Sequence, residues 1–331
     1  MPGDRPPVTL FVLAYNQEAL VRAAIEGAFA QTYQPLEIIL SDDASPDGTF
    51  AVMQEMAAAY AGPHRVILNR NPANLGLTAH VSRVMQRATG AFVVQNAGDD
   101  VSHPERTAKL VAAWRAGAGR VMAVHSGMRR RGADGATAPY PPSRPPMAGV
   151  GPYAVIRDGL HLIGASLGWD RAVFDVFGPL PAPVLVEDRP IAFRASLLGE
   201  IAYVEEPLLD YRLGGESDPE ADRAPSGVLY GYPLKLRRWK RSFMQGYLAD
   251  MERLSPPDAE ACRALARETL ARLDFEIALA EAGYAARALS LPRALALSLQ
   301  SRHPAVLGTN LKYLFDGPYL RWRRLRRGET A

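Results

Sequence analysis

The sequence predicts an α/β protein with a Rossmann-like, mostly parallel sheet flanked by helices, followed by a helical C-terminal extension. Compact apolar runs typical of buried strands alternate with helical segments across the first 127 residues. Strands joined in this way by helices are typical of parallel pairing. After about residue 227 the hydrophobic pattern is helical almost to the end. We therefore expect two domains, residues 1–227 and 228–331.

The expected elements follow one another in a regular order. Residues 17–31 place Leu20, Val21, Ala24, Ile25, Ala28 and Phe29 on one helical face. The glycines and prolines of residues 129–151 predict a long loop. The expected strands are 8–15, 36–43, 65–70, 91–98, 121–127 and 201–213, and the expected helices are 17–31, 49–61, 77–89, 104–117, 171–178 and 187–199.

Composition and cysteine content exclude several classes of protein. The chain has 331 residues, of which 48% are hydrophobic and 22% charged, as expected for a folded globular protein. Its net charge of +3 comes without a zinc finger, an RRM core or a basic zipper, so we expect no nucleic-acid partner. A single cysteine, Cys262, excludes an intramolecular disulfide and a cysteine-based zinc site. Together with the lack of a signal-peptide pattern and of a long apolar run, this predicts a cytoplasmic protein.

Polar side chains break the hydrophobic pattern where three of the predicted strands end. In an open parallel sheet, ligands bind beyond the carboxyl ends of the strands, so we expect these residues to share one rim. Clustered carboxylates suit Mg²⁺ or Mn²⁺ shared with substrate phosphates, whereas Asp and Asn are also ordinary turn and cap residues. The residues are Tyr15 and Asn16, Asp42 and Asp43, and Asp99 and Asp100.

Other nucleotide and metal motifs are missing. The chain has no G-x-x-x-x-G-K-[ST] segment and no G-x-G-x-x-G after its first strand. Residues 43–54 begin like a calcium loop, but the twelfth position is Gln54 in place of a bidentate Glu. An EF-hand is therefore excluded.

The segment of residues 8–49, "NLG" at 74–76 and "AGDDVSHPER" at 97–106 together resemble family 2 of the inverting glycosyltransferases, which have the GT-A fold. The resemblance spans about residues 8–213. It implies a nucleotide-sugar half over about 1–127 and an acceptor half over about 151–213.

The resemblance also implies roles for individual residues. Leu13, Ala14, Tyr15 and Asn16 would bind the nucleotide sugar, with Tyr15 against the base. Asp43 would accept a hydrogen bond from the base, Asp99 would lie near the donor ribose or sugar, and Asp100 would be the metal ligand. "VEDRPIAFRASLLG" at 186–199 matches a later element of the family and makes Asp188 the candidate catalytic base. The other interpretation of Asp188 is an N-terminal helix cap.

Three positions depart from the family pattern. Ala97 stands where many members carry a further acidic residue, and Val81-Ser82 stand where an Arg-Asn pair is common. Lys235 occupies the Gln position of the Q-x-x-R-W element found in processive synthases, which argues for the addition of a single sugar.

The implied function is metal-dependent transfer of one sugar from a nucleotide-diphosphate sugar, expected to be a UDP-sugar, to a glycan or lipid-linked acceptor in surface polysaccharide synthesis. Mn²⁺ or Mg²⁺ is the expected cofactor. A sugar nucleotidyltransferase and a degenerate, non-catalytic glycan-binding protein are the alternatives.

Two segments have two interpretations each. Residues 161–170, "HLIGASLGWD", form part of an acceptor pocket or a buried strand with Trp169 in the core. The C-terminal tail, residues 311–331, interleaves arginines with aromatic and leucine side chains. It forms either a peripheral contact with an anionic membrane surface or a solvated helix end.

Overall fold

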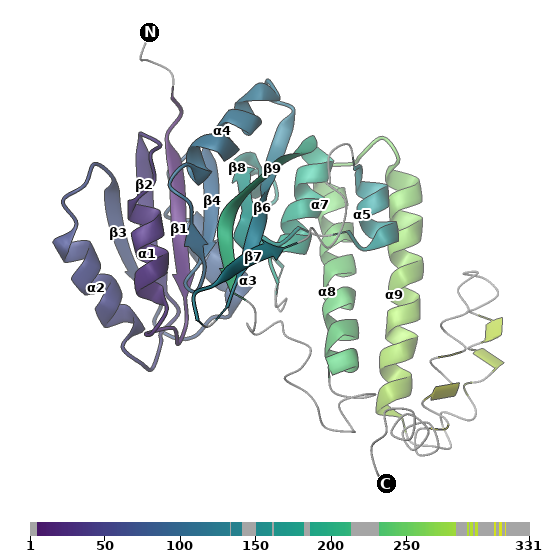
Figure 1. Cartoon of the computed structure of the whole chain (residues 1–331). Helices are drawn as coiled ribbons and strands as arrows, with labels where there is room; N and C mark the ends of the chain where they lie inside the picture. The colour runs from purple at the N-terminus through teal and green to yellow at the C-terminus, as the bar shows by residue number, and fades with distance from the viewer. Residues whose placement is uncertain are drawn as a thin grey trace. The chain divides into compact units, whose positions relative to one another are not determined.

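A mixed sheet occupies the centre of the first of two units in the computed structural model (Figure 1). The structure describes residues 5–132, 134–140, 150–160, 162–181, 186–212 and 232–282, and a few positions between 290 and 315. The first unit comprises Met1–Gly215 and Ala249–Ala259, and the second comprises Glu216–Leu248 and Glu260–Ala331.

Among the described residues, nine strands form one sheet in the order β3-β2-β1-β4-β8-β6-β9-β5, with β7 paired to β6. The strands β3, β2, β1 and β4 are parallel to one another. β8 runs antiparallel to both of its neighbours, and β6 and β9 are again parallel. The bounds are β1 Val8–Ala14, β2 Leu36–Asp42, β3 Arg65–Arg70, β4 Phe92–Ala97, β5 Val101–Ser102, β6 Val121–Arg131, β7 Thr137–Tyr140, β8 Leu167–Asp170 and β9 Glu200–Arg212.

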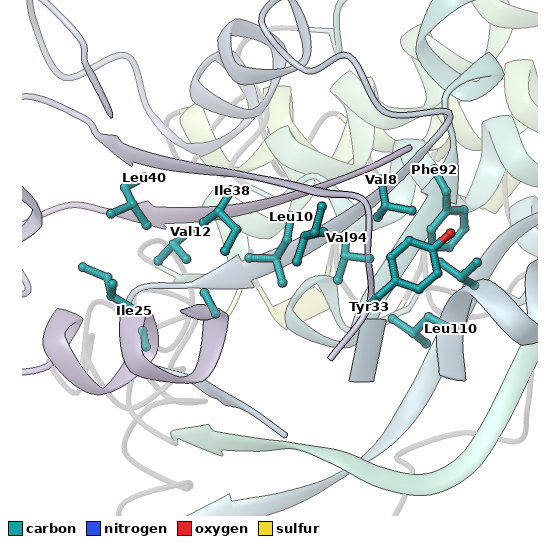
Figure 2. Close-up of a cluster of buried hydrophobic side chains, with 14 of the residues drawn as sticks. Val8, Leu10, Val12, Ile25, Tyr33, Ile38, Leu40, Phe92, Val94 and Leu110 are labelled. Atoms are coloured by element: carbon teal, nitrogen blue, oxygen red, sulfur yellow. The ribbon is translucent and has the colours of Figure 1, made fainter. Parts of the chain in front are cut away.

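Strands β1 and β2 are buried along their whole length, which explains why most of their side chains are apolar. Figure 2 shows alternate β1 side chains packed with those of β2, β4 and the helices of one face. The intervening Phe11 points to the other face, where its ring meets that of Trp169 at 5.8 Å. The helices of this half are α1 Val21–Phe29, α2 Thr49–Ala59, α3 Leu77–Met85 and α4 Arg106–Ala116.

The expected loop over 129–151 is wrong at two places. β6 continues to Arg131, and Thr137–Tyr140 form β7, which pairs with Met128–Arg131 in an antiparallel hairpin. The turn includes Gly135 with a φ of +79°, a conformation that glycine adopts without strain. Local glycines therefore marked a tight turn inside a hairpin, whereas residues 141–149 lie outside the described part.

All six expected helices are shorter in the structure than their patterns, and α1 is shortened most. α1 begins at Val21 rather than at residue 17, because the Gln17 amide donates to Thr49 Oγ1 and residues 18–20 form a turn. The segment 171–178 contains only α6, Ala172–Asp175. The remaining elements of the acceptor half are α5 Pro152–Asp158, the 3₁₀ helix η1 Gly164–Ser166 and α7 Asp188–Leu198.

The C-terminal pattern is helical as expected, with α8 over Tyr232–Arg253 and α9 over Ala259–Glu281. Within the second unit, basic side chains of α8 pair with acidic side chains of α9: Arg237 with Glu276, Arg238 with Glu281 and Arg241 with Asp274. No helix in the described ranges has the length and apolar character needed to cross a bilayer. Most of the C-terminal tail lies outside the described residues, so its predicted lipid contact remains a prediction.

Candidate functional site

The ends of β1, β2 and β4 lie side by side, because these strands are parallel and in matching register (Figure 1). Leu13 and Ala14 are buried at the end of β1, and their carbonyls accept hydrogen bonds from the Gly98 and Asp43 amides at 2.7 and 3.0 Å. The next side chain, Tyr15, is 39% exposed. The strand therefore holds the rim together through its main chain, and one aromatic ring is exposed at its end.

Asn16 begins a segment that is joined to the loop after β2. Its φ is +54°, in the left-handed region that Asn tolerates better than most residues. Its amide donates to Ser45 Oγ at 2.9 Å, and the Glu18 amide donates to Asp47 Oδ2 at 3.0 Å. The Ser, Asp and Thr residues of "SDDASPDGT" thus hold the Tyr15-Asn16 segment in place.

Asp43 lies just beyond β2 and is only 3% exposed. Three donors converge on its carboxylate: Asn71 Nδ2 at 2.7 Å, the Leu75 amide at 3.0 and 3.1 Å to its two oxygens, and the Gly76 amide at 2.9 Å. Asp43 therefore holds the loop of residues 71–76 against the strand ends. The Leu75 side chain of that loop is 42% exposed.

A series of buried side-chain hydrogen bonds supports this arrangement. Asn69 Nδ2 donates to Asn71 Oδ1 at 3.2 Å and to Ser41 Oγ at 2.9 Å, and Ser41 Oγ lies 2.6 Å from His80 Nε2. Burial lowers the pKa of His80, which keeps the imidazole neutral at physiological pH. These four residues were missed at the sequence level, because nothing in their local pattern indicates that they meet.

Asp42 does not join the rim, contrary to expectation. It is fully buried, and its Oδ2 accepts from the Ser45 amide at 3.1 Å and pairs with Arg70 Nε at 3.2 Å. It is a structural residue of the loop after β2. Three of the four expected carboxylates, Asp43, Asp99 and Asp100, remain at the strand ends.

The Asp99-Asp100 turn is held by Asn96, which sequence reasoning also missed. Asn96 Nδ2 donates to the carbonyls of Ala97 and Asp100 at 2.8 and 3.0 Å. Gly98 allows the turn to lie directly against β1, because a Cβ there would come within 2.7 Å of Ala14 Cβ and 2.4 Å of Gln17 Oε1. The turn is thus positioned by β1 and by β4.

The electrostatics of this turn favour a cation. Asp100 is 1% exposed; its Oδ1 accepts from the Arg212 amide at 2.8 Å, and its Oδ2 is buried with no hydrogen-bond partner in the described part of the chain. Burial and the neighbouring Asp99 charge raise the pKa of Asp100 well above its ordinary value, and burial raises the pKa of Asp99. A divalent cation would relieve both effects, so the pair fits Mg²⁺ or Mn²⁺.

The cation would need further ligands from outside these two residues. Within the described ranges, no group of three or more His, Cys, Asp or Glu side chains is arranged to hold a metal ion. Mg²⁺ is commonly bound through one or two carboxylates together with substrate phosphates, and this donor set matches that pattern.

Arg106, the last residue of "AGDDVSHPER", is a buried organiser of the site. Its guanidinium donates to the Gln95, Ala165 and Leu167 carbonyls at 2.8, 2.6 and 3.4 Å. It also donates to Ser102 Oγ and Asn96 Oδ1 at 2.8 and 3.2 Å. Burial lowers the pKa of Arg106 to about 10, so it stays cationic at neutral pH. Arg106 joins β4 to η1 and β8. The sequence motif that contains Arg106 did not predict these contacts.

Asp188 is the first residue of α7, and the N-cap position belongs to Glu187, which makes no side-chain cap hydrogen bond. The Oδ1 atom of Asp188 is buried and has no hydrogen-bond partner among the described residues. Burial and the charge of Glu187 raise the pKa of Asp188 to about 8. After burial, the charges of Asp100, Asp99 and Asp188 all contribute to raising the pKa of Tyr211 to about 12. The end of β9 therefore contacts Asp100 and lies within electrostatic range of Asp99 and Asp188.

In the segment that follows His161, Trp169 belongs to the hydrophobic core. This side chain is fully buried between the rings of Phe11 and Phe174, at centroid distances of 5.8 and 5.9 Å. Val81 and Ser82 are also buried, and Ser82 Oγ accepts from the Leu180 amide at 3.0 Å. These positions support the packing.

Sequence comparison relates the N-terminal half to known proteins. Residues 9–144 match the family model "Glycosyl transferase family 2". The "Putative glycosyltransferase EpsE" of Bacillus subtilis is 37% identical over 107 residues, which are 32% of this chain and 38% of that protein. The cholesterol galactosyltransferase of Borreliella burgdorferi is 33% identical over 93 residues, 28% of this chain and 25% of that protein. The matches thus span about a quarter to two fifths of these relatives.

Structural comparison extends over nearly the whole chain. S. aureus TarS 1-349 in complex with UDP-GlcNAc superposes with a TM-score of 0.59 at 14% identity, covering 97% of this chain and 92% of that one. Mannosyltransferase PcManGT from Pyrobaculum calidifontis, in complex with GDP-Man and Mn²⁺, gives 0.54 at 22% identity, with coverages of 96% and 89%. The predicted GT-A type fold is confirmed.

Proposed function

We propose that this chain, whose residues 9–144 match the model of glycosyltransferase family 2, is an inverting, metal-dependent enzyme that transfers one sugar from a UDP-sugar to an acceptor in polysaccharide synthesis. The observation that carries the proposal is the Asp99-Asp100 turn. It presents a buried carboxylate oxygen without a partner in the described part of the chain, at strand ends that also carry Asp43 and Tyr15.

The preference for a uracil base follows from the hydrogen bonds of Asp43. An ionised carboxylate has about four lone-pair sites, and three protein donors already use this one. Because the Leu75 amide is shared between both oxygens, at most one site is left, which suits the single ring N–H of uracil better than the adjacent N1–H and N2–H donors of guanine. The exposed ring of Tyr15 on the neighbouring strand end would contact the face of the base.

The diphosphate would be bound at the acidic turn. Asp100, with Asp99 beside it, would hold Mn²⁺ or Mg²⁺, and the bound ion stabilises the charge of the leaving nucleoside diphosphate. PcManGT, a structural neighbour, binds Mn²⁺ together with its nucleotide sugar. Asn96 and Arg106 would position the two carboxylates before the donor arrives.

Asp188 would accept the proton of the attacking acceptor hydroxyl. A general base works best when its pKa lies near the operating pH, and a value of about 8 meets this condition. The position of its charge close to Tyr211, along with those of Asp99 and Asp100, supports a place beside the donor sugar. A glycan or a lipid-linked sugar is the proposed acceptor; WfaP of Escherichia coli, 28% identical over 93 residues, is named for glucosyl transfer to a diphosphoundecaprenol-linked sugar.

A panel of nucleotides and nucleotide sugars tests the proposal. UDP, GDP and their sugars are added with Mn²⁺, Mg²⁺ or EDTA, and melting temperature and release of nucleoside diphosphate are measured. UDP with metal at about 100 times its dissociation constant should add about 2.7 kcal/mol of stability, and GDP should add less. An unchanged melting temperature with saturating UDP and Mn²⁺ would refute the assignment. Binding without any turnover would favour the non-catalytic alternative.

A further inference from the structure

A second buried carboxyl group lies directly beside Asp188 and has no assigned role. Glu187 is 3% exposed, and none of the ion pairs among the described residues involves it. Burying an unpaired carboxyl group costs stability, so this residue contributes little to the fold through its charge. Its position next to the proposed base suggests a contribution to the reaction.

Two further residues hold the Glu187 carboxyl group in place. Gln95 of β4 is also buried, and its Nε2 donates to Glu187 Oε1 in a short hydrogen bond. Gly164 of η1 faces the same atom: a Cβ at this position would lie 1.9 Å from Glu187 Oε1 and 3.2 Å from Gln95 Nε2. Gly164 has no positive φ, so the close approach, and not its backbone conformation, requires glycine. We name Gln95, Gly164 and Glu187 the Gln95 junction.

The Gln95 junction connects the two halves of the site through adjacent residues of β4. The Asn96 side chain holds the Asp99-Asp100 turn, and the Gln95 side chain holds the residue before Asp188. Successive side chains of a strand point to opposite faces, so one strand can reach both groups. The Gln95 carbonyl also accepts from Arg106 at 2.8 Å, which restrains the strand at this point.

We propose that the Gln95 junction positions Asp188 for proton transfer from the acceptor, with Gln95 and Glu187 acting as positioning residues and Gly164 as the space that admits them. This inference rests on the proposed function. Among the described residues, Gln95 has no side-chain hydrogen bond to the residues assigned to the nucleotide, so we expect the junction to affect turnover and not donor binding.

The amide of Gln95 suits this role in either protonation state of Glu187. Its Nε2 donates to an ionised carboxylate, and its Oε1, buried and without a partner in the described part of the chain, can accept from a protonated one after the amide turns over. Burial raises the pKa of Glu187. The charges of Glu187 and Arg189 shift the pKa of Asp188, upward and downward respectively. The charge of Asp188 in turn helps to raise the pKa of Tyr211 in β9.

Three variants of the full-length protein test the proposal: Gln95→Met, which keeps the volume but removes both polar atoms, Gly164→Ala, and Glu187→Gln. Gly151→Ala is the matched control, because a Cβ at Gly151 meets nothing within 4 Å. UDP dissociation constants with Mn²⁺ are measured by calorimetry. The kcat, the KM and the pH profile are measured by release of UDP from whichever UDP-sugar the parent protein hydrolyses.

We expect Gln95→Met and Gly164→Ala to lower kcat at least tenfold while the UDP dissociation constant stays within about twofold. The double variant Gln95→Met/Gly164→Ala should lose little more kcat than either single variant, because both substitutions act on the same contact with Glu187. Glu187→Gln removes a like charge and should move the acidic limb of the kcat profile to lower pH. This variant keeps size and hydrogen bonding, so it provides the test even if Gln95→Met does not fold.

Two results would overturn the proposal. One is parental kcat and an unmoved pH profile in folded variants. The other is an equal loss of UDP binding and turnover, which would indicate a general structural role. Both results are read against a parent protein that binds UDP and releases it from a UDP-sugar, so a failure of the donor assignment is recognised in the parent before any variant is compared. If the parent does neither, the proposed function fails and the variants are not informative about it.

Discussion

Replacing Arg106 by methionine removes a guanidinium that donates to five acceptors while keeping much of the volume of its side chain. The side chain is fully buried. Ser102 Oγ and Asn96 Oδ1 keep the 2.7 Å hydrogen bond between them. Of the three carbonyls, those of Gln95 and Ala165 lose partners at 2.8 and 2.6 Å, whereas that of Leu167 loses only a long hydrogen bond of 3.4 Å. The loss therefore falls on two backbone acceptors that join β4 to η1.

The magnitude follows from these two carbonyls. A buried polar group left without its partner costs about 1–3 kcal/mol, so two of them cost about 2–6 kcal/mol. Removing a buried charge also removes its desolvation cost, which offsets part of this loss. We expect Arg106→Met to lower the free energy of unfolding by about 2 kcal/mol, out of a total of about 5–15 kcal/mol for a typical domain.

Urea denaturation measures this difference. Trp114 and Trp169 lie in the same unit as Arg106, so intrinsic fluorescence follows its unfolding. A lower midpoint at an unchanged slope reports stability alone. Arg115→Met on the same helix is the control, because Arg115 is exposed and its loss should change stability by no more than about 0.5 kcal/mol. If Arg106→Met unfolds at the midpoint of that control, the organising role of Arg106 is wrong.

The further predictions concern catalysis, metal binding and membrane contact. Asp188→Asn should leave UDP affinity unchanged and lower turnover on the order of 10²-fold or more, and parental turnover in a folded variant would exclude Asp188 as the base. Because the pKa of Asp188 is raised to about 8 in the folded protein, parental kcat/KM, which reports the free enzyme, should rise with pH up to about 8. Protonated Asp188 contributes stability to the folded protein that is fully present below about pH 4 and is lost as the pH rises from about 4 to about 8. The Asn variant should lack this pH dependence of the free energy of unfolding. Asp100→Asn should weaken Mn²⁺-dependent UDP binding, measured by calorimetry with EDTA as the reference; equal binding would mean that Asp100 is not a ligand. Truncation after residue 317 should reduce sedimentation with anionic vesicles without changing donor hydrolysis, and equal sedimentation would remove the lipid interpretation of the tail.

The order of the strands and helices could be predicted because it depends on local pattern. β1 and β2 are buried at every position and mostly apolar, since both faces of the sheet are covered, and the amphipathic face of residues 20–29 is the buried face of α1. The hairpin of β6 and β7 could not be predicted in the same way. Its second strand has the weak pattern of Thr137–Tyr140, and it is a strand because it pairs with β6.

Asp42 and Asp43 show the limit of residue type as evidence. They are adjacent and chemically identical, yet one is buried against Arg70 and the other holds the loop of residues 71–76. The difference arises from the direction in which the chain leaves β2. A sequence contains no signal for that direction, because it results from the packing of the neighbouring loops.

From its order of residues alone, this chain specifies a parallel α/β half, a set of polar strand ends and an acidic turn, since hydrophobic periodicity and parallel pairing act over short stretches or by general rules. The partners that make those strand ends a site come from far along the chain. Leu75 lies 32 residues from Asp43, Glu187 lies 92 residues from Gln95, and Arg212 lies 112 residues from Asp100. Such contacts exist only after the sheet has formed, because burial beside particular neighbours, and not residue type, sets the hydrogen bonds and proton affinities of these side chains.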